Sequence, residues 1–429
     1  MKKNIFLLFF ILTSISCQSG ELFDKYFINK SLRIDFVLSG DSASQSAALF
    51  QLREEPVWGG PVNNLIDEFG YGGYYIQVFD KTSNKLIYSR GFNTLFEEWR
   101  STPQATTEVQ AWINSISVPY PKAPVVLELS ARKKEDMQFH RLMKLEVDPT
   151  SIFIDRSQLK NNEISQIQYK GDPSNKVDLV FIGDGYTKDE QDKFDEDAKR
   201  FTNALFKTAP FTEHQDDFNI WSVNIISEDS GTDISGEGIF KNTALNAGFY
   251  TFGVDRYLTT SDAKAIRDAV WNVPCDAVFI LVNSEKYGGG GMYNFYAIGT
   301  AHNPLTIEVF VHELGHSFAG LADEYYTSET AFDELYYNIK GEPWEPNITT
   351  LVNFDAKWKD LLPAGTPVPT PSEEKYIHNI GAFEGAGYMA KGIYRPVDHC
   401  MMNDLTPFCP VCSRAIKQMI LYHTDKKYK

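Results

Sequence analysis

The sequence predicts a multidomain α+β protein, in which an N-terminal antiparallel β-sandwich is followed by an α/β domain. Hydrophobic residues make up 43% of the 429 residues and charged residues 23%, which is typical of a folded globular chain long enough for two or three domains. The apolar pattern changes near residue 177, from short alternating stretches to a buried strand followed by an amphipathic helix. We expect four segments: a signal at 1–17, the sandwich at 18–160, a linker at 161–176 and the α/β domain at 177–429.

The start of the chain has the pattern of an export signal with a lipid anchor. Lys2 and Lys3 precede an apolar run at 5–12, which is too short to span a bilayer. Small residues then lead to Cys17, as in a bacterial lipobox, although Ser14 stands where leucine is usual. An ordinary cleaved signal is the alternative. We expect an exported protein, lipid-anchored through Cys17 to the bacterial outer membrane or cell surface, with the periplasmic side as a second location.

Net charge excludes two classes of partner. Lys and Arg number 41 against 57 for Asp and Glu, which gives a formal charge of −16. Nucleic-acid and polybasic membrane binding both depend on Lys and Arg. We therefore expect no nucleic-acid partner and membrane contact through the lipid anchor only, and the oligomeric state stays open.

The expected sandwich contains stretches in which apolar and polar residues alternate, separated by Gly, Pro, Asn and Asp. No catalytic constellation is found among them, so we expect a structural or substrate-presenting role. The predicted strands lie at 31–38, 73–79, 86–90, 125–129 and 142–147.

The expected α/β domain opens with a near-continuous apolar run at 177–182, typical of a strand covered on both faces. Thr187 and Glu190 are spaced for a capping box, and apolar residues at helical spacing follow them. Further strands are expected at 218–226 and 277–282.

A His-Glu-x-x-His motif lies in an amphipathic helix predicted at 305–319. Residues four apart on a helix project side by side, so His312 and His316 can hold one small cation, and neutral imidazole suits Zn²⁺. Glu313 is placed to take a proton from a bound water. Two surface histidines are the alternative, which the apolar surroundings disfavour. Glu308, one turn earlier, is expected in the outer surroundings of the site or in solvent.

A catalytic zinc needs a third protein ligand. A continuing helix would carry residue 323 about 16 Å past His312, so the chain must turn, and Gly320 can form a left-handed cap. Asp323 is the preferred ligand because its short side chain suits a position just after a tight turn. Glu324 remains the alternative.

These residues resemble a metzincin zinc helix with aspartate as third ligand, although Gly320 follows His316 by four residues instead of the usual three. The segment 312–325, together with 392–396, 400–402 and 408–412, is similar to the IgA metallopeptidase family (peptidase family M sixty-four). The resemblance covers about 177–422, and the preceding strands look like that family's N-terminal domain.

The resemblance implies a zinc-dependent endopeptidase with one catalytic Zn²⁺ on His312, His316 and Asp323, and with Glu313 as general base. Its substrates would be proteins, with immunoglobulin A or other extracellular host proteins as candidates. The remaining implied features are a turn methionine at Met402 with Met401 as the alternative, an edge strand at 288–298 that binds an extended peptide, and Tyr394 with Arg395 as candidates for oxyanion or substrate contact. A surface-binding lipoprotein with a degenerate or structural metal site is the alternative function, which the complete His-Glu-His set disfavours.

Cysteines cluster near the end of the chain. Cys400 lies close to Cys409 and Cys412, and an exported chain can hold disulfides. We expect a disulfide from Cys400 to Cys409 or Cys412. A zinc site that includes His399 is less favoured, since the spacing fits no standard finger.

Overall fold

The computed structural model describes residues 20–326 and 339–428. The expected signal segment and Cys17 lie outside these residues, so export and lipidation stay predictions. Within the described residues, no helix combines the length and apolar character needed to cross a bilayer.

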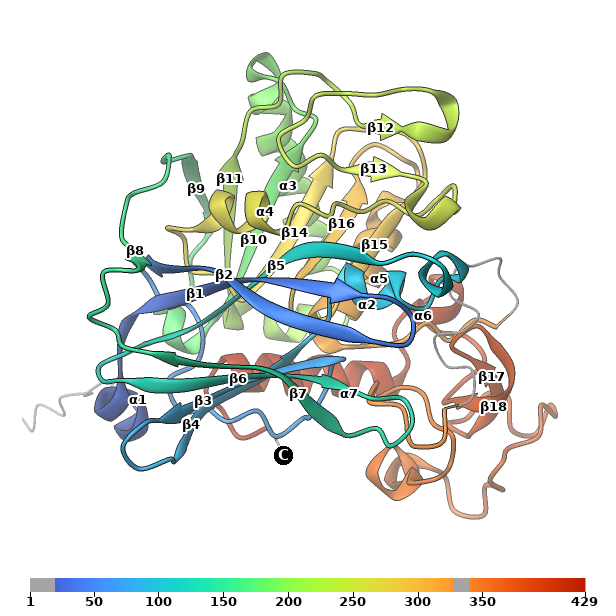
Figure 1. The fold of residues 1–429 in the computed structure, drawn as a ribbon. Helices are drawn as coiled ribbons and strands as arrows, with labels where there is room; N and C mark the ends of the chain where they lie inside the picture. The colour runs from blue at the N-terminus through green and yellow to red at the C-terminus, as the bar shows by residue number, and fades with distance from the viewer. Residues whose placement is uncertain (1–19, 327–338, 429) are drawn as a thin grey trace, which may run out of the picture.

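Two four-stranded sheets form the N-terminal region and share one hydrophobic core (Figure 1). Every strand predicted from alternation is present, because side chains such as Tyr74, Ile76 and Val78 turn alternately into this core. Pairing is antiparallel except between β2 and β8, which run parallel. The first sheet has the order β5 (Gln110–Pro121), β1 (Phe27–Gly40), β2 (Gln45–Glu55), β8 (Ile154–Asp155), and the second β4 (Leu86–Phe92), β3 (Tyr74–Asp80), β6 (Val125–Arg132), β7 (Phe139–Val147). Two short helices, α1 (Glu21–Tyr26) and α2 (Leu95–Trp99), complete the region.

A six-stranded mixed sheet forms the centre of the second region. Its inner strands run parallel, and its edge strands β9 and β15 are antiparallel to their neighbours. All residues of β10 are buried, as its apolar run predicts. The segment 161–176, expected as a linker, contains β9, which pairs with β11. The strand order is β15 (Gly289–Met292), β16 (Tyr296–Thr300), β14 (Ala277–Val282), β10 (Val177–Asp184), β11 (Phe218–Asn224), β9 (Glu163–Gln168).

Helices cover both faces of this sheet. On one face, α3 (Gln191–Leu205), α5 (Thr306–Ala319) and α7 (Pro410–His423) share a core with alternate side chains of β10. On the other face lies α4 (Ala263–Val270). The predicted capping box of Thr187 and Glu190 forms in the 3-10 turn before α3. The remaining elements are β12 (Asp233–Ile234), β13 (Gly248–Phe249), β17 (Phe383–Ala386), β18 (Met389–Arg395) and α6 (Met401–Asp404).

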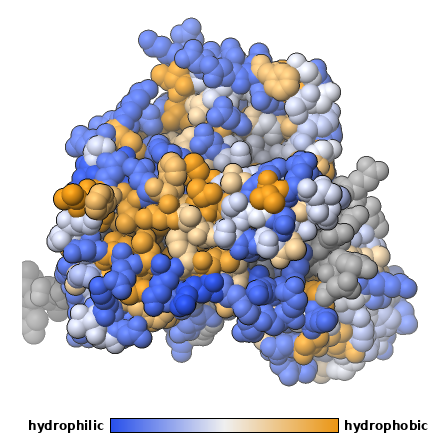
Figure 2. Space-filling view, viewed as in Figure 1, coloured by the Kyte–Doolittle hydropathy of each residue, from blue (hydrophilic) through white to orange (hydrophobic). Residues whose placement is uncertain are grey.

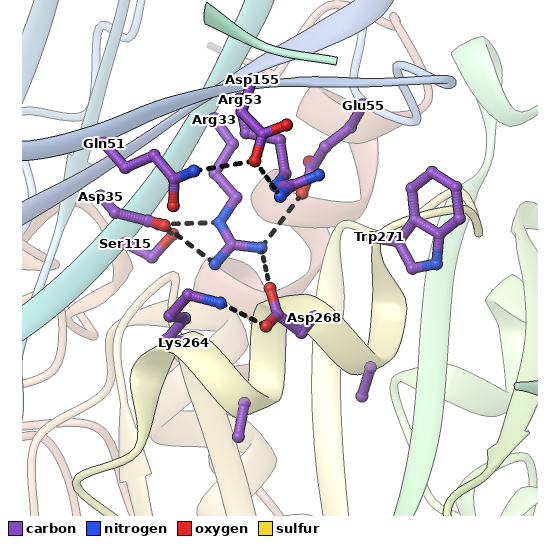
Figure 3. Close-up of polar contacts among 12 residues, drawn as sticks. Arg33, Asp35, Gln51, Arg53, Glu55, Ser115, Asp155, Lys264, Asp268 and Trp271 are labelled. Carbon is purple, nitrogen blue, oxygen red and sulfur yellow. Dashed lines mark hydrogen bonds and ion pairs between the residues drawn. The ribbon is translucent and has the colours of Figure 1, made fainter. Parts of the chain in front are cut away.

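A buried charge network joins the two regions (Figure 3). Arg33 of β1 is 0% exposed and makes a two-pronged contact with Asp35, with N–O distances of 2.7 and 3.0 Å. Its third nitrogen reaches Asp268 of α4 at 2.7 Å. Because an unpaired buried charge is unfavourable, Arg33 ties the first sheet to this helix.

Apolar side chains gather on the face shown in Figure 2, in the area that β1 and β2 occupy in Figure 1. Leu49 and Phe50 of β2 are among the exposed large apolar side chains.

Candidate metal centre

Helix α5 carries the His-Glu-x-x-His motif and is anchored by its apolar face. Phe310 packs in the core against aromatic side chains of β10, α3 and β14, with Phe279 at a centroid distance of 4.7 Å. The helix ends at Gly320, whose φ of 67° and ψ of 28° are left-handed, as predicted. The chain therefore turns back, and Asp323 returns to the two histidines.

Three ligand atoms converge at this point. The two Nε2 atoms of His312 and His316 lie 3.0 Å apart, and Asp323 Oδ1 lies 3.1 and 3.3 Å from them. Bonds of about 2.0–2.1 Å in a tetrahedron separate such ligands by about 3.3 Å. Apart from the imidazoles, Asp323 Oδ1 has no hydrogen-bond partner among the described residues. The three atoms therefore fit a small divalent cation.

Outer contacts orient all three side chains. The Nδ1 atoms of His312 and His316 lie 2.9 and 2.6 Å from the carbonyls of Met401 and Leu321, so each Nδ1 donates and each Nε2 is free to bind. The Tyr388 hydroxyl donates to Asp323 Oδ2. Sequence reasoning missed Tyr388, because its distance along the chain from the motif follows no fixed spacing.

The site attracts positive charge. Burial opposes protonation of His316, but the Asp323 carboxylate outweighs it and raises the pKa of this imidazole to about 9. A divalent cation bound by the three side chains would replace that proton.

Glu313 lies beside the ligands. One of its oxygens is within 4.8 Å of the ligand atoms of both histidines. Burial raises the pKa of Glu313 above its ordinary value, which makes its carboxylate a stronger base. Strand β15 approaches closely because it is glycine-rich: a Cβ on Gly289 would lie 2.8 Å from a Glu313 carboxylate oxygen. At Gly289 the outer edge of β15 is already bridged by Tyr257, so the expected peptide-binding edge is partly occupied.

A cleft of about 1170 Å³ opens over these residues. Both regions line it, so the N-terminal region, for which a structural or substrate-presenting role was expected, contributes to the cleft. Glu97 and Glu98 of α2 lie in its wall, as do Arg132 and Lys134. Tyr257 donates a hydrogen bond to Glu98, and burial raises the pKa of Glu98 to about 8. The N-terminal region therefore helps to form the surface that any ligand of the cleft meets.

The other candidate residues occupy distinct places. Met402 is fully buried beneath α5, with its sulfur 3.0 Å from where a Cβ on Gly315 would lie, whereas Met401 supplies the carbonyl for His312. Tyr394 lies on β18 and is not among the described residues that line the cleft, whereas Tyr388 lines it and donates to Asp323. Arg395 is buried and bonds to Asp398 and to two backbone carbonyls. Glu308 lies in the first turn of α5. Among the described residues, it is not part of the group formed by His312, Glu313 and His316.

Glu324 does not join the histidines. It lies in a second group with Cys400, Cys409 and Cys412. These three cysteines are free thiols. The expected disulfide is wrong for this structure, since the Cys400 and Cys412 sulfurs lie 3.6 Å apart and a disulfide bond is about 2.05 Å. His399 is exposed and bonds to Asp404, away from the thiols.

Two known family models match the chain. The model described as IgA Peptidase M64 matches residues 165–379 and 372–420, and the model described as Peptidase M64 N-terminus matches residues 22–143. No curated protein matches the chain. The matched segments include both regions and all the converging side chains. The peptidase family suggests that the protein binds a metal. The chain belongs to the IgA Peptidase M64 family.

Proposed function

We propose that this protein is a zinc-dependent, metzincin-like endopeptidase. The observation that carries the proposal is the convergence of His312 Nε2, His316 Nε2 and Asp323 Oδ1 at 3.0–3.3 Å, next to Glu313. Three protein ligands that leave one position open are the pattern of catalytic zinc. A bound zinc ion would polarise the scissile carbonyl and acidify a water.

Glu313 acts as the general base. Its carboxylate takes a proton from the attacking water and passes it to the leaving amine nitrogen, so no serine or cysteine nucleophile is needed. The backbone carbonyls of Met401 and Leu321 hold the imidazoles, and Tyr388 holds Asp323. Met402 supports α5 from below.

The substrate is a protein whose chain enters the cleft in extended form. Immunoglobulin A and other extracellular host proteins are the candidates, because the family label names the first. The side chains of Arg132 and Lys134 lie in the cleft wall and would contact the bound chain.

Cleavage of casein and metal content, measured on one preparation, test this function. Glu313→Gln keeps the size of the side chain but cannot accept a proton, so cleavage should fall by about 10²–10⁴-fold while the zinc stays bound. Glu308→Gln, one turn earlier on α5, is the control and should cleave normally. Near-normal cleavage by a zinc-loaded Glu313→Gln would refute the mechanism. A wild-type protein that binds zinc without cleaving any protein would favour the surface-binding alternative.

We also propose that the protein is exported and held at the membrane by a lipid on Cys17, with no nucleic-acid partner. Cys17→Ala should then move the protein from the membrane fraction to the soluble fraction. Unchanged membrane retention would contradict the anchor.

A further inference from the structure

A second cluster of metal-ligand side chains lies directly behind the candidate active site. Cys400 precedes α6, Cys409 and Cys412 lie at the start of α7, and Glu324 follows the last residue of the catalytic set. One atom from each side chain lies within 4.8 Å of all the others. All four side chains are buried, with exposures of 0–5%.

The spacing of these atoms fits one tetrahedral ion. Bonds of about 2.3 Å to sulfur and 2.1 Å to oxygen place two sulfurs about 3.8 Å apart and a sulfur and an oxygen about 3.6 Å apart. The Cys400 and Cys412 sulfurs are separated by 3.6 Å, and Cys412 Sγ lies 3.2 Å from Glu324 Oε1. A disulfide would use only two of the three thiols and would leave the carboxylate without a charge partner.

The polar contacts around the cluster are those of a charged site. The Cys409 amide donates to Cys400 Sγ and the Cys412 amide donates to Cys409 Sγ, both at 3.4 Å. Such donors stabilise thiolates, as does the start of a long helix. Glu324 Oε1 accepts from Asn347 at 2.9 Å, but Glu324 Oε2 has no hydrogen-bond partner among the described residues. A fully buried carboxylate oxygen without a partner is unfavourable, and either a proton or a cation that approaches it removes the penalty; the three thiols beside Glu324 favour the cation.

We propose that Cys400, Cys409, Cys412 and Glu324 bind a second, structural zinc ion. Thiolates select zinc over magnesium or calcium, and four protein ligands close the coordination sphere, which is typical of a structural site. His399, considered from the sequence as a fourth ligand, is replaced in this site by Glu324.

The second zinc would hold together the segments that position the catalytic set. The Glu324 amide donates to the Met402 carbonyl at 2.7 Å, and the Met401 carbonyl accepts from His312. Glu324 directly follows Asp323 in the chain. The ion would therefore fix, from behind, the backbone on both sides of the catalytic metal.

Metal analysis of the full chain, purified anaerobically with reductant, tests the proposal. We expect about two zinc ions per chain in the wild type, one in His316→Ala, one in Cys409→Ser and none in the double variant. Cobalt(II) replaces zinc as a spectroscopic probe. Its sulfur-to-metal charge-transfer bands should persist in His316→Ala and disappear in Cys409→Ser.

The cobalt spectra distinguish the two metal sites, because among the proposed ligands only Cys400, Cys409 and Cys412 carry sulfur. A cobalt-loaded His316→Ala without charge-transfer bands overturns the second site, as does a wild type with one zinc and a mapped Cys400–Cys412 disulfide. Neither result affects the proposed peptidase, which depends on the convergence of His312, His316 and Asp323 beside Glu313. If Cys409→Ser does not fold, the cobalt spectra of the wild type and of His316→Ala still decide the question.

Discussion

Replacement of Arg33 by methionine is expected to loosen the contact between the two regions. Methionine keeps most of the side-chain volume, but Asp35, which is 0% exposed, then keeps the Ser115 hydroxyl at 2.6 Å as its one side-chain partner among the described residues. Glu55 also loses Arg33, 3.6 Å away, whereas Asp268 is partly exposed and keeps Lys264. Removing one partner of a buried ion pair typically costs about 3–5 kcal/mol. We expect Arg33→Met to lose stability on that scale.

Denaturant unfolding, followed by circular dichroism and by tryptophan fluorescence, measures the loss, and coincident transitions justify a two-state free energy. Asp268→Asn removes the negative charge of Asp268, whose side chain is 30% exposed. Its loss of stability should therefore be smaller than that of Arg33→Met. Lys81→Met is the control, since Lys81 and Glu146 form an exposed pair, and its midpoint should not change. Unfolding of Arg33→Met at the wild-type denaturant concentration would refute the reasoning. Cleavage should fall in Arg33→Met, because the N-terminal region lines part of the cleft.

Two further predictions concern the active site and pH. Tyr388→Phe removes the donor to Asp323 Oδ2 and should weaken zinc binding or activity by about 10–100-fold. Competition with a chelator measures the zinc affinity, and the control variant Tyr394→Phe should bind zinc normally. Equal losses in both variants would contradict the assigned contact. Burial raises the pKa of Glu55 from 4.5 to about 7, so the folded state holds a proton that the unfolded state releases, and stability falls as pH rises between these values. Glu55→Gln should remove this part of the pH dependence of the unfolding free energy, which is of order 1–3 kcal/mol. If the unfolding free energy of Glu55→Gln varied with pH as in the wild type, Glu55 would not titrate in this range.

Local features of the fold could be predicted from the sequence because they depend on nearby residues. Alternation gives the strands of the N-terminal region, an unbroken apolar run gives β10, and the spacing of His312 and His316 on a helix gives the pair of imidazoles. Gly320 marks the turn because only glycine adopts that backbone conformation without strain. These signals lie within a few residues of the feature that they predict.

Features that depend on distant segments could not be predicted in this way. Strand β9 is mostly polar and half-buried, since it lies at a sheet edge, so its sequence resembles a linker. Tyr388 reaches Asp323 only through the β17–β18 turn. The cleft wall formed by Glu98 requires the N-terminal region to dock, a contact that no single segment encodes.

The choice between Asp323 and Glu324 shows how far sequence reasoning reaches at this site. Both carboxylates follow the same turn, and side-chain length was the only basis for preferring one. The structure separates them by direction: Asp323 faces the imidazoles, and Glu324 faces Asn347 and the thiols. Two adjacent acids in a buried segment would be unfavourable unless each met positive charge or donors. The pair is therefore explained if two neighbouring groups of side chains each use one carboxylate, and the left-handed turn at Gly320 lies in the connection that sets both directions.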